Sequence, residues 1–96
     1  MVVEHLTFDV PVDELAGWLR HEEAHWSRFL ERQDGFVRKE MWRSIDDPTR
    51  IHAVIWWASM GQWEAIPEHD LARVAEAMGA HERTPVCERL EVIRDR

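Results

Sequence analysis

Residues 50–58 read RIHAVIWWA, a stretch rich in the β-branched and aromatic residues that favour a strand. Side chains alternate between the two faces of a strand, so one face is predicted to carry Ile51, Ala53, Ile55 and Trp57, and the other Val54 and Trp56. A sheet that is covered on one side only alternates apolar with polar residues. This strand is apolar on both sides, so other protein is expected to cover both faces of its sheet.

A second strand of the same kind precedes it. Residues 36–44 (FVRKEMWRS) are predicted to direct Val37 and Met41 to one face, and Phe36 and Trp42 to the other. Residues 46–48 (DDP) lie between the two strands, and they form a turn because proline presets the backbone and aspartate caps it. The two strands are therefore predicted to pair as a hairpin.

The N-terminal third predicts a strand followed by a helix. Residues 2–10 alternate in the manner of a strand, and Pro11 then opens an amphipathic helix that ends at Asp34-Gly35. Apolar residues recur along this helix at three- and four-residue spacing: Leu15, Trp18, Leu19, Trp26, Phe29 and Leu30. The helix is thus predicted to bury one face against the sheet.

The C-terminal part predicts a second helix and a fourth strand. Ser59 and Gln62 form a capping-box pair that starts the helix, Pro67 interrupts it, and Gly79 ends it. Residues 86–94 (VCERLEVIR) follow as a strand. The order βαββαβ predicts an α+β fold, with a ferredoxin-like antiparallel sheet and both helices on one face, as a single domain over residues 1–96. Because two helices cover only one face, a second copy of the sheet is expected on the other, giving a homodimeric α+β barrel.

Composition narrows the classes of partner. The chain has 19 acidic and 12 basic residues and a net charge of −7, so neither nucleic acid nor an anionic membrane surface is an expected partner. A single cysteine, Cys87, fits a reducing compartment, and no apolar run is long enough for a membrane helix. These features predict a soluble, cytoplasmic protein.

Residues at several positions match a pattern that is found in a known group of proteins. They are Gly35-Phe36, Lys39-Glu40, Trp42, Trp57, Ser59, Gln62-Trp63 and Ile66-Pro67. Over nearly its whole length the chain resembles the dimeric α+β barrel superfamily, which includes the antibiotic-biosynthesis monooxygenase-like domains, and within it a small bacterial family. The resemblance implies the fold and the dimer. The superfamily includes cofactor-independent oxygenases, isomerases and haem-degrading enzymes that rely on an Asn, a Trp and a His; this chain has no Asn, so that set is not carried over.

Residues 21–25 (HEEAH) match the H-E-x-x-H pattern of zinc proteases. A catalytic zinc needs a third protein ligand and an open cleft, and no third ligand follows at the usual spacing. On a helix, Glu22 would lie within the apolar stripe, His25 at its edge and His21 towards solvent. We therefore predict a chance match and no metal site, with a metal-dependent hydrolase as a remote alternative.

Glu22 is the best candidate for a catalytic residue. A carboxylate on an apolar face is costly unless it is paired or faces a wet cavity. It is therefore predicted either to reach the rim or pair with an arginine, or to line a pocket as an acid or base. Trp26 and Trp63 would wall that pocket, with His25 and His5 as further ligand-binding candidates.

Other polar residues have simpler interpretations. His5 and His52 lie on neighbouring strands, where they either face one another or meet solvent. Lys39 and Glu40 are predicted to be solvated or paired across strands, and Cys87 to serve packing.

Two functional hypotheses follow. In the first, the protein binds or oxidises a small apolar or aromatic compound without an organic cofactor, because no glycine-rich phosphate loop is present. In the second, the barrel is non-catalytic, and its rings fill only the core and the dimer interface. A cavity beside Glu22 favours the first hypothesis, and a filled interior favours the second.

Overall fold

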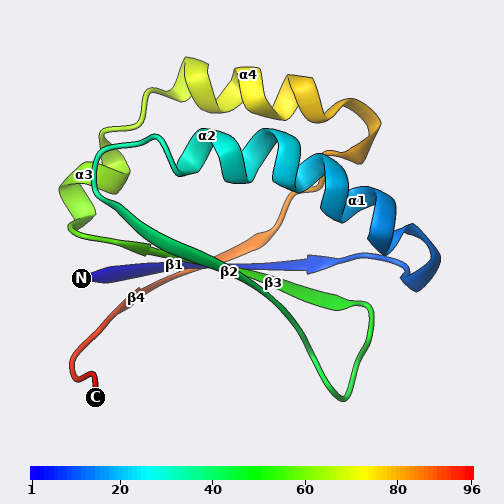
Figure 1. Cartoon of the computed structure of the whole chain (residues 1–96), viewed down its shortest axis with the longest axis horizontal. Helices are drawn as coiled ribbons and strands as arrows, with labels where there is room; N and C mark the ends of the chain where they lie inside the picture. Colours follow the sequence, from blue (N-terminus) through cyan, green and yellow to red (C-terminus); the bar gives the residue numbers. More distant parts are fainter.

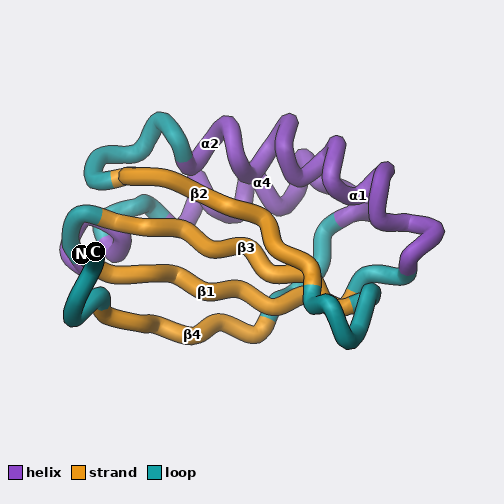
Figure 2. Tube along the Cα trace, turned by 60° about the horizontal axis from the view of Figure 1, so that its bottom comes forward, coloured by secondary structure: helices purple, strands orange, loops and turns teal.

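The computed structural model describes all residues, 1–96, and contains one four-stranded antiparallel sheet. Its strands are β1 (Val2–Asp9), β2 (Phe36–Arg43), β3 (Arg50–Trp57) and β4 (Val86–Glu91). They lie in the order β2-β3-β1-β4, with every neighbouring pair antiparallel (Figure 2). The predicted ferredoxin-like α+β fold is confirmed.

Both helical segments lie on the same side of this sheet (Figure 1). The first contains η1 (Val12–Glu14), α1 (Leu15–Glu22), η2 (Glu23–Ser27) and α2 (Arg28–Leu30). The second contains α3 (Met60–Glu64), α4 (Glu68–Met78) and η3 (Gly79–His81). None of these helices combines the length and the apolar character that a membrane crossing requires.

A π-helical turn interrupts the first helical segment. The sequence predicts one continuous helix, whereas η2 (Glu23–Ser27) is π-helical. In a π turn the backbone hydrogen bonds join residues five apart instead of four. Residues five apart then come to the same side of the helix, and Ser27 Oγ lies 2.9 Å from Glu22 Oε1.

An irregularity in β2 places Phe36 on the face of the sheet opposite to the predicted one. Phe36 pairs with Trp57, whereas Arg38 pairs with Trp56, so Val37 is an extra residue in the ladder. Because of this extra residue, Phe36 lies on the helix side of the sheet, where the centroid of its ring is 6.0 Å from that of Trp57. The prediction that Phe36 shares a face with Trp42 is therefore wrong.

The core lies between the helices and the sheet. Ile51, Ala53, Ile55 and Trp57 of β3 are all buried on that side, as predicted. The opposite face of the sheet is open, and apolar side chains lie on it among polar ones. Val54 is buried there, but Trp42, Val86 and Leu90 are 46%, 70% and 45% exposed.

The predicted helix boundaries are confirmed in the second half of the chain. The Ser59 hydroxyl accepts a hydrogen bond from the Gln62 backbone N–H at the start of α3. Pro67 separates α3 from α4, and Gly79, with φ of 57°, ends α4. Gly35, with φ of 85°, follows the first helical segment and lies so close to Gln62 that any side chain there would clash.

Candidate functional site

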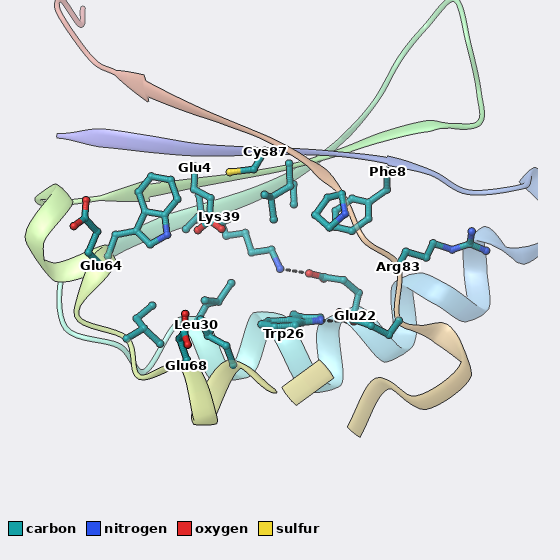
Figure 3. Close-up of a pocket in the computed structure, with 18 residues that line it drawn as sticks. Glu4, Phe8, Glu22, Trp26, Leu30, Lys39, Glu64, Glu68, Arg83 and Cys87 are labelled. Carbon is teal, nitrogen blue, oxygen red and sulfur yellow. Dashed lines mark hydrogen bonds and ion pairs between the residues drawn. The ribbon is translucent and has the colours of Figure 1, made fainter. Parts of the chain in front are cut away.

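A cavity of about 620 Å³ lies between the sheet and the helices (Figure 3). Its walls are mainly apolar and include Leu6, Phe8, Leu30, Ile55, Ile66 and Leu71. Proteins bind small molecules in concave, largely apolar sites that contain a few convergent polar groups. The ligand-binding hypothesis expects a cavity beside Glu22, and the non-catalytic hypothesis expects a filled interior. The structure contains the cavity.

Glu22 projects from the end of α1 into this cavity and is only 4% exposed. The Lys39 ammonium, from β2, donates to Glu22 Oε2, and the Ser27 hydroxyl donates to Glu22 Oε1 at 2.9 Å. Lys39 Nζ also donates to Ser27 Oγ at 2.7 Å. Three polar side chains, from α1, η2 and β2, therefore satisfy one another inside an apolar space, as buried polar groups must.

Lys39 was predicted to be solvated or paired across strands, and that prediction is wrong. Its side chain is 7% exposed, because its position in β2 directs it to the helix side of the sheet. From there its flexible stem spans the cavity to Glu22 (Figure 3). The alternative that Glu22 pairs with a cation is thus realised by a lysine instead of an arginine.

Glu4 supplies a second carboxyl group to the cavity. Glu4 in β1 and Lys39 in β2 both align with Ile55 of β3, so the three lie in one row across the sheet. The Trp57 indole N–H donates to Glu4 Oε1 at 3.1 Å. Burial raises the pKa of Glu4, and the Trp57 hydrogen bond and the charge of Lys39 oppose that rise.

Two tryptophans and two further glutamates also line the cavity. The Trp26 indole N–H donates to Glu82 Oε1 at 3.0 Å, which ties η2 to the segment before β4. Trp63 of α3 lines the cavity beside Glu64, and Glu64 accepts a hydrogen bond from Arg89 at 3.1 Å. The two rings predicted to wall a pocket therefore do line one.

Cys87 contributes the only sulfur atom of the cavity lining. Burial raises the pKa of this thiol, and the neighbouring carboxylate of Glu4 raises it further. The group is therefore a neutral thiol at neutral pH. Cys87 is nevertheless exposed, so the structure does not give it the packing role that the sequence predicts.

The two histidines predicted to bind a ligand lie outside the cavity. His25 lies on the outer side of the first helical segment, in a shallow groove beside α4 that also contains Arg28 and Arg73. His5 lies on the open face of the sheet, where its Nε2 is 2.9 Å from His52 Nδ1. Of the five ligand-binding candidates, the structure brings together Glu22, Trp26 and Trp63 only.

The HEEAH segment does not have the arrangement of a zinc site. Glu22 points inward to Lys39, whereas the ring of His21 stacks on that of His81 at 3.8 Å and lies 6.2 Å from that of His25. Nowhere do three or more His, Cys, Asp or Glu side chains gather so that they could hold a metal ion.

Sequence reasoning missed Glu4, Lys39 and Ser27 as members of the site. A signal existed for the first two, because Glu4 alternates in phase with Leu6 and Lys39 with Met41, so both face the helices. Two opposite charges on one covered face indicate a buried polar site. No comparable signal existed for Ser27, because only the π-helical turn brings it to Glu22.

Comparisons with known proteins agree with this fold. A family model described as antibiotic biosynthesis monooxygenase matches residues 1–78. No curated protein matches the chain. Among solved structures, the chain is similar to a candidate antibiotic biosynthesis monooxygenase from Bordetella bronchiseptica, with 17% identity, a TM-score of 0.78 and 97% of both chains covered.

Two other solved structures are similar over almost their full length. One is a candidate antibiotic biosynthesis monooxygenase from Deinococcus radiodurans, with 18% identity, a TM-score of 0.71 and coverage of 99% of this chain and 95% of that one. The other is the haem degrader MhuD from Mycobacterium tuberculosis, with two haems bound in its active site. It has 21% identity and a TM-score of 0.77, and the match covers 99% of this chain and 98% of that one. At these identities the similarity establishes the fold.

Proposed function

Because this chain belongs to the antibiotic biosynthesis monooxygenase family, we propose that its cavity binds a small, predominantly apolar aromatic compound. The observation that carries this proposal is a hollow of about 620 Å³ into which a buried Glu22–Lys39 pair projects. A core that served stability alone would be close-packed, with few voids larger than a water molecule.

The shape and chemistry of the walls support an aromatic ligand. Trp26, Trp63 and Phe8 present ring surfaces to the hollow. Aromatic rings attract other rings in stacked or edge-to-face arrangements, with a gain of about 0.5–1.5 kcal/mol beyond the buried area. The polar groups of Glu22, Lys39 and Glu4 enter the hollow from the helical layer and from the sheet, and they would fix the orientation of the ligand.

The reaction that we propose is oxidation of a bound hydroxyarene by O₂. With 1-naphthol as the example, one oxygen atom enters the ring to give 1,4-naphthoquinone. The other leaves as water with the hydroxyl hydrogen and one ring hydrogen, so no external reductant is consumed. Glu22, which the sequence predicts as an acid or base and which lines the hollow, would take up the hydroxyl proton.

Haem, which MhuD binds, does not suit the residues of this cavity. Protein ligands of haem iron are His, Cys, Met or Tyr. Cys87 is the one cavity residue of these types, and burial raises the pKa of its thiol, so the thiolate is disfavoured. We therefore assign haem no role in the proposed reaction.

The binding proposal is tested by narrowing the cavity from its wall. Cys87→Trp places a large ring in the hollow without removing a charged group, and Cys87→Ser is the matched control of nearly unchanged size. Isothermal titration with 1-naphthol is expected to show binding to the wild type and to the serine variant, with affinity at least tenfold weaker for the tryptophan variant. Equal affinity for all three proteins, or no binding to the wild type, contradicts the proposal.

The oxidation proposal is tested with the same compound and an oxygen electrode. Wild type is expected to consume one O₂ for each 1,4-naphthoquinone formed, and Glu22→Gln is expected to lower that rate at least a hundredfold, within the range of general base catalysis. Binding without O₂ consumption restricts the function to ligand binding for this compound.

We also propose that a second copy of the chain covers the open face of the sheet. Trp42, Leu90 and Val86 expose apolar surface there, and the side chain of Trp42 lies against Trp56 with ring centroids 6.4 Å apart. Contiguous apolar surface rimmed by polar residues is typical of an interface between proteins. The homodimer predicted from the sequence would bury this surface.

A further inference from the structure

The charged residues that line the cavity are unequal in number. Two are cationic, and five are glutamates: Glu4, Glu22, Glu64, Glu68 and Glu82. Because most of the wall is apolar, these few charges determine which ionic groups a ligand can bring into the hollow.

Both cations are already engaged. Lys39 donates to Glu22 and to Ser27, and its side chain is 7% exposed. Arg83 donates to the backbone carbonyl of Asp9 at 3.0 Å and to Glu14 at 3.4 Å, both of which lie outside the cavity lining. The buried Nε of Arg83 is its one guanidinium nitrogen without a hydrogen-bond partner. An anionic ligand would therefore have to compete with existing partners for Lys39 and for the terminal nitrogens of Arg83.

The carboxyl groups are engaged less fully. Glu4 accepts one hydrogen bond, from the neutral indole of Trp57, and it forms no ion pair within 4.0 Å. Glu82 likewise accepts only from the indole of Trp26. Glu68, at the start of α4, forms no side-chain hydrogen bond or ion pair, although it lines the cavity. The charge that remains without a counter-charge in the hollow is negative.

Among these carboxyl groups, Glu4 is the one that would gain most from a cationic group on the ligand. It projects from the central strand β1 towards the helices, in the row that also contains Ile55 and Lys39 (Figure 3). A carboxylate desolvated in such a place gains most from a cation, because charge interactions strengthen where water is excluded. The ring surfaces of Trp26 and Trp63 would further favour a ligand that is both aromatic and cationic.

We propose that the ligand of this cavity carries a protonated amine on its aromatic body, with the ammonium group against the carboxylate of Glu4. The proposal rests on the proposed function, which assigns the aromatic body to the same cavity. Glu4 would then select the ligand by charge, and Glu22 would remain available to accept a proton.

The experiment compares three naphthalene probes that differ in one substituent: 1-naphthylmethylamine, 1-naphthylmethanol and 1-naphthoate. At neutral pH they are cationic, neutral and anionic. Isothermal titration of the wild-type chain is expected to show the amine binding at least tenfold more tightly than the alcohol, and the carboxylate binding most weakly.

Two variants separate recognition at Glu4 from the overall negative charge of the protein. Glu4→Gln retains an oxygen that can accept from Trp57, so the fold should persist, and it is expected to weaken binding of the amine at least tenfold more than binding of the alcohol. Glu23→Gln removes one charge from an exposed position of the first helical segment, and it is expected to keep the preference intact.

The inference is overturned if the carboxylate binds as tightly as the amine, or if Glu4→Gln weakens the amine and the alcohol equally. In both cases the binding of the neutral alcohol would leave the proposed function standing. Binding of none of the three probes would overturn the proposed function and this inference with it.

Discussion

Lys39 of β2 and Glu22 of α1 form an ion pair inside the protein, with side chains that are 7% and 5% exposed. The pair connects the sheet to the helical layer across a cavity that its surroundings do not fill. Burying two charges costs several kcal/mol for each ion, and their mutual attraction and the hydrogen bonds of Ser27 offset that cost. This arrangement leads to predictions about stability, assembly and binding.

The first prediction concerns removal of one partner of the pair. Glu22→Leu leaves the Lys39 ammonium buried without a counter-charge, and Lys39→Met does the same to the Glu22 carboxylate. Each single substitution is expected to lower the free energy of unfolding by about 3–5 kcal/mol, whereas the double variant should recover to within about 1 kcal/mol of wild type. Urea denaturation measures all four proteins. A more stable Glu22→Leu protein would show that the carboxylate is a liability, as the non-catalytic hypothesis requires.

The second prediction concerns two glycines in different surroundings. A Cβ atom added at Gly35 would lie 2.6 Å from Gln62 Cβ, and the φ of 85° is unfavourable for other residues. Gly35→Ala is expected to lower the free energy of unfolding by about 1–3 kcal/mol. Gly61, in α3, has no atom within 4 Å of its added Cβ, so Gly61→Ala should raise stability by about 0.5–1 kcal/mol. Equal effects of the two substitutions would contradict the close approach of Gly35 to Gln62.

The third prediction concerns the pH dependence introduced by Glu4. Its pKa is raised above the ordinary value of 4.5, so the folded state favours the protonated form. Its contribution to stability is therefore fully present below pH 4.5 and is lost as the pH rises through the higher pKa of the folded state. Glu4→Gln does not titrate, so the variant should gain stability relative to wild type between about pH 4 and about pH 8. Denaturation at the two pH values tests this, and a gain that is larger at acid pH would contradict it.

The fourth prediction concerns assembly through the open face of the sheet. Trp42→Lys introduces a charge on the open face of the sheet, at the β2 edge, and is expected to convert a dimer into a monomer. Val12→Lys alters a residue that is 56% exposed at the start of the first helical segment, on the helix side, and should leave the dimer intact. Native mass spectrometry of both variants and wild type measures the mass directly. A monomeric wild type would contradict the proposed homodimer.

Much of the fold was predictable because local chemistry and long-range packing agree. The strand at residues 50–57, the cap at Ser59, the break at Pro67 and the end at Gly79 each follow from one residue type in one context. Glu22 was predicted to lie on an apolar face because the helical period, counted from Trp18, places it there.

The errors have physical causes that the sequence pattern does not carry. The extra residue Val37 in β2 reverses the facing of Phe36, and a count of alternating residues has no signal for such an irregularity. The π-helical turn that brings Ser27 to Glu22 is likewise invisible to a count of 3.6 residues per turn. The facing of Lys39 follows from alternation with Met41, but its partner Glu22 lies 17 positions away in the chain, so neither residue alone predicts the ion pair.

The most direct test of the central claim, that the cavity is a binding site for an aromatic compound, uses the six tryptophans as reporters. In a proton–nitrogen NMR spectrum each indole N–H gives its own signal. Addition of 1-naphthol is expected to shift the indole signals of Trp26, Trp57 and Trp63, which lie at the cavity or contact Glu4, and to leave those of Trp42 and Trp56 on the open sheet face unchanged. Shifts confined to Trp42 and Trp56, or no shifts at all, would contradict the claim.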